Sequence, residues 1–327
     1  MNELRVILNR ELVPPRLRWH MWCHVAGLPE CFEMGKYDAL KISAMSKPIG
    51  WTMDSSIVVK ESSSSLSSSR RSSMTDVSDT ICQIKRDLFR TFPGSQFFMN
   101  PVHISQLGDV ITTFSLAHKQ QLGYCQGMNF LAGVLLQVSD SEEESFWLLS
   151  LIMDKYNLRG LFVEGLPLLH LLRFEFLFLL HATMKDVHDH LETLQVTPEM
   201  FAVKWFFSMF AYSFKLNVVV EIWDFLLAAK PPRELHAGFQ RCIIMVSLGI
   251  TRALRKNLLA SHTSEDVVSM LSSIDLTAKQ ILANTRDVDS KIPQSMMDLI
   301  RAKWATDNQA LNAAICEGGV GAGTSNP

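Results

Sequence analysis

The chain has 327 residues, of which 47% are hydrophobic, and carries a net charge of -2 with an isoelectric point near 6.6. This length allows two or more hydrophobic cores, and the balanced charge excludes a surface dominated by basic residues. We therefore expect no nucleic acid partner. The six cysteines are scattered and form no Cys-x-x-Cys pair, which argues against a zinc ribbon or a disulfide framework. With no secretory leader, we expect a cytoplasmic protein.

The N-terminal segment contains a helix that begins near Pro15, because proline suits the first position of a helix. Leu17, Met21 and Val25 are spaced to lie on one face of it, and Gly27 predicts its end.

Residues 54–78 are rich in serine and poor in apolar residues, so we predict a disordered insertion. The alternative is a regulatory segment, phosphorylated at Ser72 or Ser73 beside Arg70 and Arg71.

Regular structure resumes at Thr80, which together with Gln83 fits a capping box at a helix start. Ile84 lies on the predicted buried face of this helix. Pro93 disfavours helical structure in the residue before it, which places Arg90 near the C-terminal end of the helix.

Further helical patterns fill most of the remaining sequence. We predict two helices within 101–139 around a break at Gly123, with Gln126 at the start of the second, and a helix over 142–155. Further helices are predicted over 166–185, 186–195, 198–214, 218–229, 235–259, 264–274, 277–285 and 290–304. The apolar stretch 166–180 is interrupted by charged residues and is shorter than the roughly 20 residues of a membrane span. Because no alternating strand pattern is present, we predict an all-α fold of about 12 to 16 helices.

Arg90 and Gln126 are the two candidate catalytic residues. In GTP hydrolysis an arginine neutralises charge on the transferred phosphoryl group and a glutamine orients the attacking water. Each alone is ordinary, since Arg90 could simply pair with Asp87 and Gln126 could cap a helix.

The two strings around these residues are more specific in combination. Residues 84–93 read I-x-x-D-x-x-R-T-F-P, and residues 123–129 read G-Y-C-Q-G-M-N. Both resemble signatures of the TBC domain, the family of Rab GTPase-activating proteins. The P-x-x-R-x-x-x-W string at 15–22 and the aromatic strings at 205–210 and 222–224 resemble further landmarks of this family, in the right order. Trp19, the segment 228–230 and the serine-rich insertion depart from the family pattern.

The resemblance implies an all-α fold with two helical lobes in a V-shaped arrangement. The N-terminal lobe is expected over 1–160, the C-terminal lobe over 161–305, and a disordered tail over 306–327. Arg90 and Gln126 are implied to act in trans on a GTP-bound Rab. The resemblance also implies supporting or partner-binding roles for Asp87, Tyr124, Ile84, Gly123 and Gly127.

This resemblance implies a GTPase activator in vesicle trafficking rather than a self-contained enzyme. We expect no cofactor of its own, with GTP and magnesium held by the Rab, and recruitment to endomembranes through that partner. The alternatives are a catalytically inactive Rab-binding helical module and a plain helical scaffold.

Other candidate sites are weaker. Cys125 is interpreted as a small buried thiol rather than a nucleophile. His181, His188 and His190 do not share the spacing of ligands on one helix face, so we interpret them as a solvated polar face and expect no metal.

Overall fold

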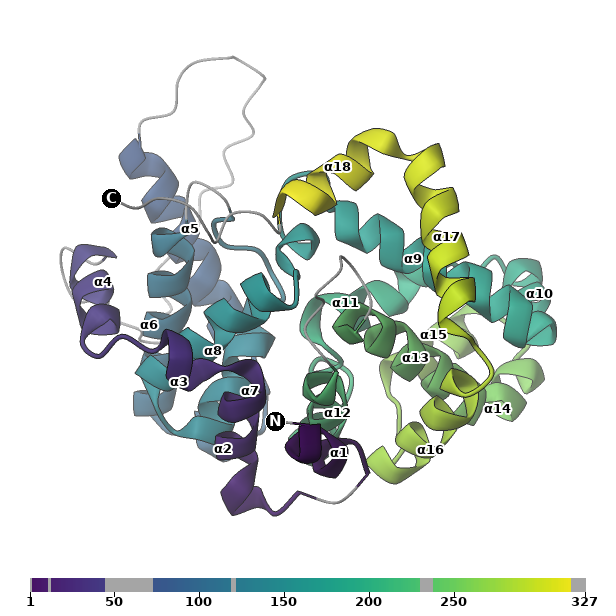
Figure 1. Cartoon of the computed structure of the whole chain (residues 1–327), viewed down its shortest axis with the longest axis horizontal. Coiled ribbons are helices and arrows are strands. Elements are labelled where there is room, and N and C mark those ends of the chain that lie inside the picture. The colour runs from purple at the N-terminus through teal and green to yellow at the C-terminus, as the bar shows by residue number, and fades with distance from the viewer. Residues whose placement is uncertain (1, 11–12, 45–72, 119–121, 230–237, 319–327) are drawn as a thin grey trace. The chain divides into compact units, whose positions relative to one another are not determined.

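The computed structural model describes residues 2–10, 13–44, 73–118, 122–229 and 238–318. These residues contain eighteen α-helices, three short 3-10 helices and no strand, so the all-α prediction is confirmed for them (Figure 1). The helices outnumber the predicted ones because sharp breaks divide several long helical patterns. Packing groups the chain into a first unit, Met1–Phe32 with Trp147–Pro327, and a second unit, Glu33–Phe146.

The second unit carries the two strings of interest. Its elements are α4 (Lys36–Ala44), α5 (Ser73–Leu88), η1 (Phe97–Met99), α6 (Pro101–Ala117), α7 (Met128–Ser139) and the start of α8 (Glu142–Lys155). Helix α5 packs against α6 and α7, and its Ile84 side chain is completely buried. Lys41 of α4 forms ion pairs with Asp109 and Glu142, at 2.8 and 2.7 Å, which join α4 to α6 and α8.

The first unit is built from both ends of the chain. Its N-terminal helices are α1 (Asn2–Arg10), α2 (Pro15–Ala26) and α3 (Leu28–Cys31). After α8 come η2 (Arg159–Leu161), α9 (Pro167–Thr183), α10 (Lys185–Thr193), η3 (Pro198–Met200), α11 (Ala202–Ser208) and α12 (Leu216–Ala228). The last helices are α13 (Gly238–Ala253), α14 (Arg255–Ala260), α15 (Ser264–Ser272), α16 (Ala278–Asp289), α17 (Gln294–Asp307) and α18 (Gln309–Gly318). Helix α9 is central, since α10, α11, α13, α17 and α18 all pack against it (Figure 1).

A buried polar cluster joins α2 to α12. The Asp224 carboxylate accepts hydrogen bonds from Arg18 Nε at 3.1 Å and from Trp22 Nε1 at 2.7 Å. All three residues are nearly or fully buried. This cluster explains why the first 32 residues group with the C-terminal part of the chain, a grouping that differs from the predicted lobe over 1–160. The V-shaped arrangement of the lobes stays a prediction.

Several predicted helix bounds differ from the structure. Helix α5 begins at Ser73 rather than Thr80, within the stretch predicted to be disordered. An existing helix extends at little cost compared with starting a new one, so turns can be added beyond a packed segment. The rest of that insertion, 54–72, lies outside the described residues.

The predicted disordered tail over 306–327 contains α18, whose Ile315 is 1% exposed. This helix packs against α9 and α17, so its apolar residues gain burial that the local sequence does not reveal. The pattern over 198–214 is interrupted because Met209 and Phe210 adopt positive φ and end α11.

Within the described residues, no single helix has the length and apolar character to cross a membrane. The bent pair α9 and α10 reaches that threshold only when taken together, across a bend of 116°. Eight residues of α9 are buried inside the first unit, which accounts for its apolar composition as a core helix.

Candidate functional site at the ends of α5 and α7

The first part of the site is the tight turn that follows α5. The backbone N–H of Arg90 donates to Asp87 O at 3.3 Å, and that of Thr91 donates to Leu88 O at 3.1 Å. Phe92 then adopts a φ of +50° directly before Pro93, so the chain leaves the helix axis sharply. The prediction that Arg90 lies near the end of a helix is confirmed.

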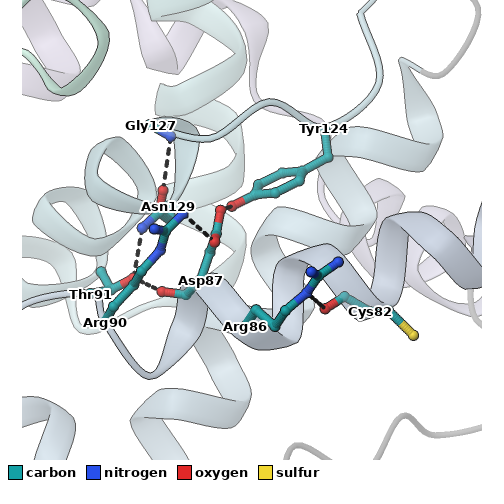
Figure 2. A network of polar contacts seen from close by, with 8 residues as sticks. All are labelled: Cys82, Arg86, Asp87, Arg90, Thr91, Tyr124, Gly127 and Asn129. Carbon is teal, nitrogen blue, oxygen red and sulfur yellow. Dashed lines mark hydrogen bonds and ion pairs between the residues drawn. The ribbon is translucent and has the colours of Figure 1, made fainter. Parts of the chain in front are cut away.

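Asp87 links Arg90 to the second string. One carboxylate oxygen lies 2.5 Å from Arg90 Nη2, and the other accepts a hydrogen bond of 2.6 Å from the Tyr124 hydroxyl (Figure 2). The Asp87 side chain is 5% exposed, whereas that of Arg90 is 51% exposed. A buried carboxylate thus holds a guanidinium that remains accessible to solvent.

Tyr124 acts as a hydrogen-bond donor throughout the physiological range. Burial, the hydrogen bond to Asp87 and the charge of that carboxylate raise the pKa of Tyr124 far above its usual value. The phenol therefore keeps its proton beside Asp87, and the bond between them is charge-assisted.

The second part of the site is the turn that precedes α7. Gly123 and Gly127 have φ angles of +62° and +111°, which glycine adopts without the strain that a side chain would bring. Gln126 lies between them and is exposed. The N-cap residue of α7 is Gly127, so Gln126 precedes the N-cap position rather than occupying it.

Asn129 connects the two turns, and sequence reasoning missed this role. Its amide nitrogen donates to Thr91 Oγ1 at 2.8 Å, and its Oδ1 accepts from the Gly127 N–H at 3.0 Å (Figure 2). Asn129 is fully buried and Thr91 is 3% exposed. A polar residue in the first turn of a strongly apolar helix was the available signal.

Glycine at position 133 provides the space for this arrangement. A Cβ atom there would lie 3.0 Å from the Phe92 ring and 3.2 Å from the Thr91 methyl group. The turn after α5 therefore packs directly on the backbone of α7.

Arg90 and Gln126 line one open pocket. Its volume is about 370 Å³, and its lining residues are Gln83, Arg86, Asp87, Arg90 and Gln126. Arg86 is exposed and was not predicted as part of the site. The pocket thus presents two guanidinium groups and two amides, all of which can bind oxygen atoms of phosphate or water.

The remaining predicted residues have supporting positions. Ile84 is fully buried, so it stabilises α5 from the core and has no surface to offer a partner. Burial, followed by the charge of Asp87, raises the pKa of the Cys125 thiol, which makes it a poor nucleophile.

Comparison with known structures identifies the fold. The Chlamydomonas flagellar RabGAP TBC domain is similar at a TM-score of 0.64 and 18% identity, over 86% of this chain and 83% of that chain. The Ypt/Rab-GAP domain of Gyp1p is similar at a TM-score of 0.65 and 17% identity, over 88% and 90% of the two chains. At these identities the similarity establishes the fold.

Sequence relatives are similar over shorter segments. Human TBC1 domain family member 1 is 35% identical over 142 residues, which are 43% of this chain and 12% of that protein. The Rab GTPase-activating protein tbc-11 of Caenorhabditis elegans is 37% identical over 147 residues, 44% of this chain and 16% of that protein. The GTPase-activating protein GYP5 of Saccharomyces cerevisiae is 34% identical over 167 residues, 49% of this chain and 18% of that protein. Each of these relatives is much longer than the segment it shares with this chain.

The model of the Rab-GTPase-TBC domain matches residues 15–259, three quarters of the chain, and includes both turns of the site. This chain therefore belongs to the Rab-GTPase-TBC domain family.

Proposed function

We propose that this protein accelerates GTP hydrolysis by a Rab GTPase and that Arg90 and Gln126 supply the catalytic groups in trans. Family membership supports the activity, as do the names of relatives such as tbc-11, a Rab GTPase-activating protein. The main support for assigning these two residues is that Arg90 and Gln126, which are far apart in sequence, line the same open pocket.

Arg90 would stabilise negative charge on the phosphoryl group of the bound GTP. Its Nη2 is held by Asp87, and this single contact leaves the other donors of the guanidinium for phosphate oxygens. In the small GTPase Ras, an arginine supplied in trans raises the hydrolysis rate by about 10³–10⁵-fold, and we adopt that range as the expected scale.

Gln126 would orient the attacking water. Its side chain is exposed and lines the open pocket, so the amide is available to a water molecule or to the partner. Because the amide both donates and accepts, one positioned glutamine can hold a water in line with the phosphoryl group. Asp87 and Tyr124 act as positioning residues rather than as catalytic residues.

The partner would bring its own GTP and magnesium ion, and the chain would require no cofactor of its own. Because a partner Rab would lie on a membrane, we expect a cytoplasmic protein that associates peripherally with endomembranes. The second candidate is a Rab-binding module without activity, which would require neither an accessible Arg90 nor an accessible Gln126.

Single-turnover hydrolysis with a panel of GTP-loaded Rabs tests the proposal. A responsive Rab should hydrolyse GTP far faster with the wild-type chain than with Arg90→Ala or Gln126→Ala. Arg86→Ala is the comparison, since it removes the other guanidinium group of the same pocket and shows whether the effect is specific to Arg90. Binding of a Rab without any acceleration would support the inactive module, and equal acceleration by all variants would contradict the assignment of both residues.

A further inference from the structure

A second cluster of reactive side chains lies in the first unit, at the corner between α9 and α10. Helix α9 ends at Thr183, α10 begins at Lys185, and their axes differ by 116°. This bend brings His181, in the last turn of α9, against His188 of α10. Their ring centroids are 4.8 Å apart, with the rings nearly perpendicular at 81°.

Asp189 completes a set of three metal-ligand groups. One potential ligand atom from each of His181, His188 and Asp189 lies within 4.8 Å of the other two. His188 Nδ1 is 3.3 Å from an Asp189 oxygen, and an oxygen of Glu192, which lies outside this set of three, is 3.8 Å from the same nitrogen. We propose that His181, His188 and Asp189 bind one divalent transition-metal ion, with Zn²⁺ as the best fit to two imidazoles and a carboxylate.

The donor types select the class of ion. Imidazole nitrogen with carboxylate oxygen suits Zn²⁺ and its neighbours, whereas Ca²⁺ and Mg²⁺ prefer a shell of oxygen atoms. Ligand bonds to Zn²⁺ of about 2.0–2.2 Å require the donor atoms to approach one another more closely than 4.8 Å. His181 and Asp189 are exposed and can rotate to close the gap, while the partly buried His188 provides a fixed point.

Lys185 is the charged group that competes with a cation for this site. Its Nζ lies 2.6 Å from Asp189 Oδ2, whereas His188 faces the other oxygen, Oδ1. The carboxylate can therefore bind an ion through Oδ1 while Lys185 remains on Oδ2.

The bend explains why the sequence argued against a metal here. On a single straight helix, residues separated by seven positions lie about two turns apart, too far to share an ion. The break at Met184 instead folds the end of α9 back toward the first turns of α10. A bound ion would tie the two helices together across this corner.

Calorimetric titration with Zn²⁺ of the metal-free full chain tests the proposal. Cys31→Ser and Cys82→Ser should be present in every sample, because these two exposed thiols could bind zinc on their own. Zn²⁺ binding should saturate near one ion per chain. Co²⁺ added in place of Zn²⁺ should show the visible absorption bands of a protein-bound ion. His181→Gln and Asp189→Asn should each weaken Zn²⁺ binding by at least about tenfold. Loss of a residue that only hydrogen-bonds to a metal ligand already has an effect of this size.

Two further variants sharpen the result. His190→Gln is the matched control on the same helix, since His190 Nε2 contacts Ser261 O at 3.1 Å and lies outside the cluster. Its Zn²⁺ affinity should equal that of the parent chain, which carries only the substitutions Cys31→Ser and Cys82→Ser. Lys185→Ala should bind Zn²⁺ more tightly because it removes the competing charge.

Circular dichroism of the metal-free variants verifies that each is folded, and both ligand substitutions are at exposed positions. Absence of binding in the parent chain would overturn the proposal. Loss of affinity in His190→Gln as large as in His181→Gln would also overturn it, as would unchanged affinity in the two ligand variants.

Discussion

The carboxylate of Asp87 is shared between Arg90 and Tyr124, with contacts of 2.5 Å to the guanidinium and 2.6 Å to the phenol hydroxyl. These two partners come from separate turns of the chain. A single buried acid therefore fixes the direction of Arg90 and the position of the turn that carries Gln126. We expect this shared contact to matter for catalysis more than for binding of the Rab.

Asp87→Asn should reduce the maximal stimulated rate of hydrolysis while the affinity for the Rab changes little. Asparagine has the same shape but lacks the charge that attracts Arg90, so the guanidinium loses its preferred orientation. Misplacement of a catalytic group by about 1 Å can reduce a rate by about 10²-fold, which sets the upper limit of the effect. Tyr124→Phe removes only the hydrogen bond to Asp87 and should reduce the stimulated rate less. Hydrolysis rates measured at increasing concentrations of this protein give the maximal stimulated rate and the affinity for the Rab separately. A variant that loses only affinity would contradict this role of Asp87.

Arg90→Lys should fail to stimulate hydrolysis although it preserves the positive charge. Lysine presents a single ammonium group, which cannot contact Asp87 and phosphate oxygens with separate, fixed donors. Single-turnover hydrolysis by a responsive Rab measures the effect, and the melting temperature should remain that of the wild type because the side chain is half exposed. Wild-type stimulation by this variant would exclude the arginine-finger role.

If Gln126 replaces the glutamine of the GTPase, stimulation should persist on a Rab whose switch glutamine is changed to leucine. Gln126→Ala should lose stimulation on both forms of the Rab, because the change removes the amide that is proposed to hold the attacking water. Gln126→Ser is the matched variant, since serine can cap a helix but cannot span the same distance. Full activity of Gln126→Ser on either Rab would remove Gln126 from the catalytic set.

Asn129→Ala should lower both the stability of the chain and the stimulated rate. The change leaves Thr91 Oγ1 and the Gly127 N–H without their buried partner, at an expected cost of about 1–3 kcal/mol in the free energy of unfolding. Thr91→Val is the comparison, because it removes the link between the turns but leaves the contact with Gly127 intact. Chemical denaturation gives the free energies, and hydrolysis is measured on the fraction that remains folded. An unchanged rate in both variants would show that the turns are positioned independently.

The stability of the chain should depend on pH through Asp224. Burial raises the pKa of Asp224 to about 6, although the charge of Arg18 and the hydrogen bond from Trp22 act in the opposite direction. The folded state therefore binds this proton more tightly than the unfolded state does. The stabilisation is fully present below the ordinary pKa of an aspartate and is lost as the pH rises through about 6.

Asp224→Asn keeps the shape of the side chain and cannot titrate, so its unfolding free energy should lack this step. Denaturation of both chains between about pH 4 and pH 7 provides the measurement. A wild-type chain that gains stability relative to Asp224→Asn across this interval would contradict the direction of the shift.

Local sequence patterns were sufficient to predict the helical class, the succession of most helices and the location of both turns. Period-3.6 patterns identify helices wherever one face is buried, and Pro93, Gly123 and Gly127 mark backbone conformations that few other residues allow. The strings around Arg90 and Gln126 were recognisable because they resemble signatures of the TBC domain. Helix ends were harder to predict, because α5 extends back to Ser73 and α18 gains its stability by packing against α9 and α17.

The contacts between distant residues, in contrast, became visible only in the folded chain. Asp87 meets Tyr124, Thr91 meets Asn129, and Arg18 meets Asp224 across separations of 37, 38 and 206 residues. The bend after α9 likewise brings His181 to His188. Local periodicity specifies which face of a helix is buried, but not which other helix covers it. Those pairings depend on how all the apolar faces are buried together, and that is a property of the packed chain rather than of any one segment.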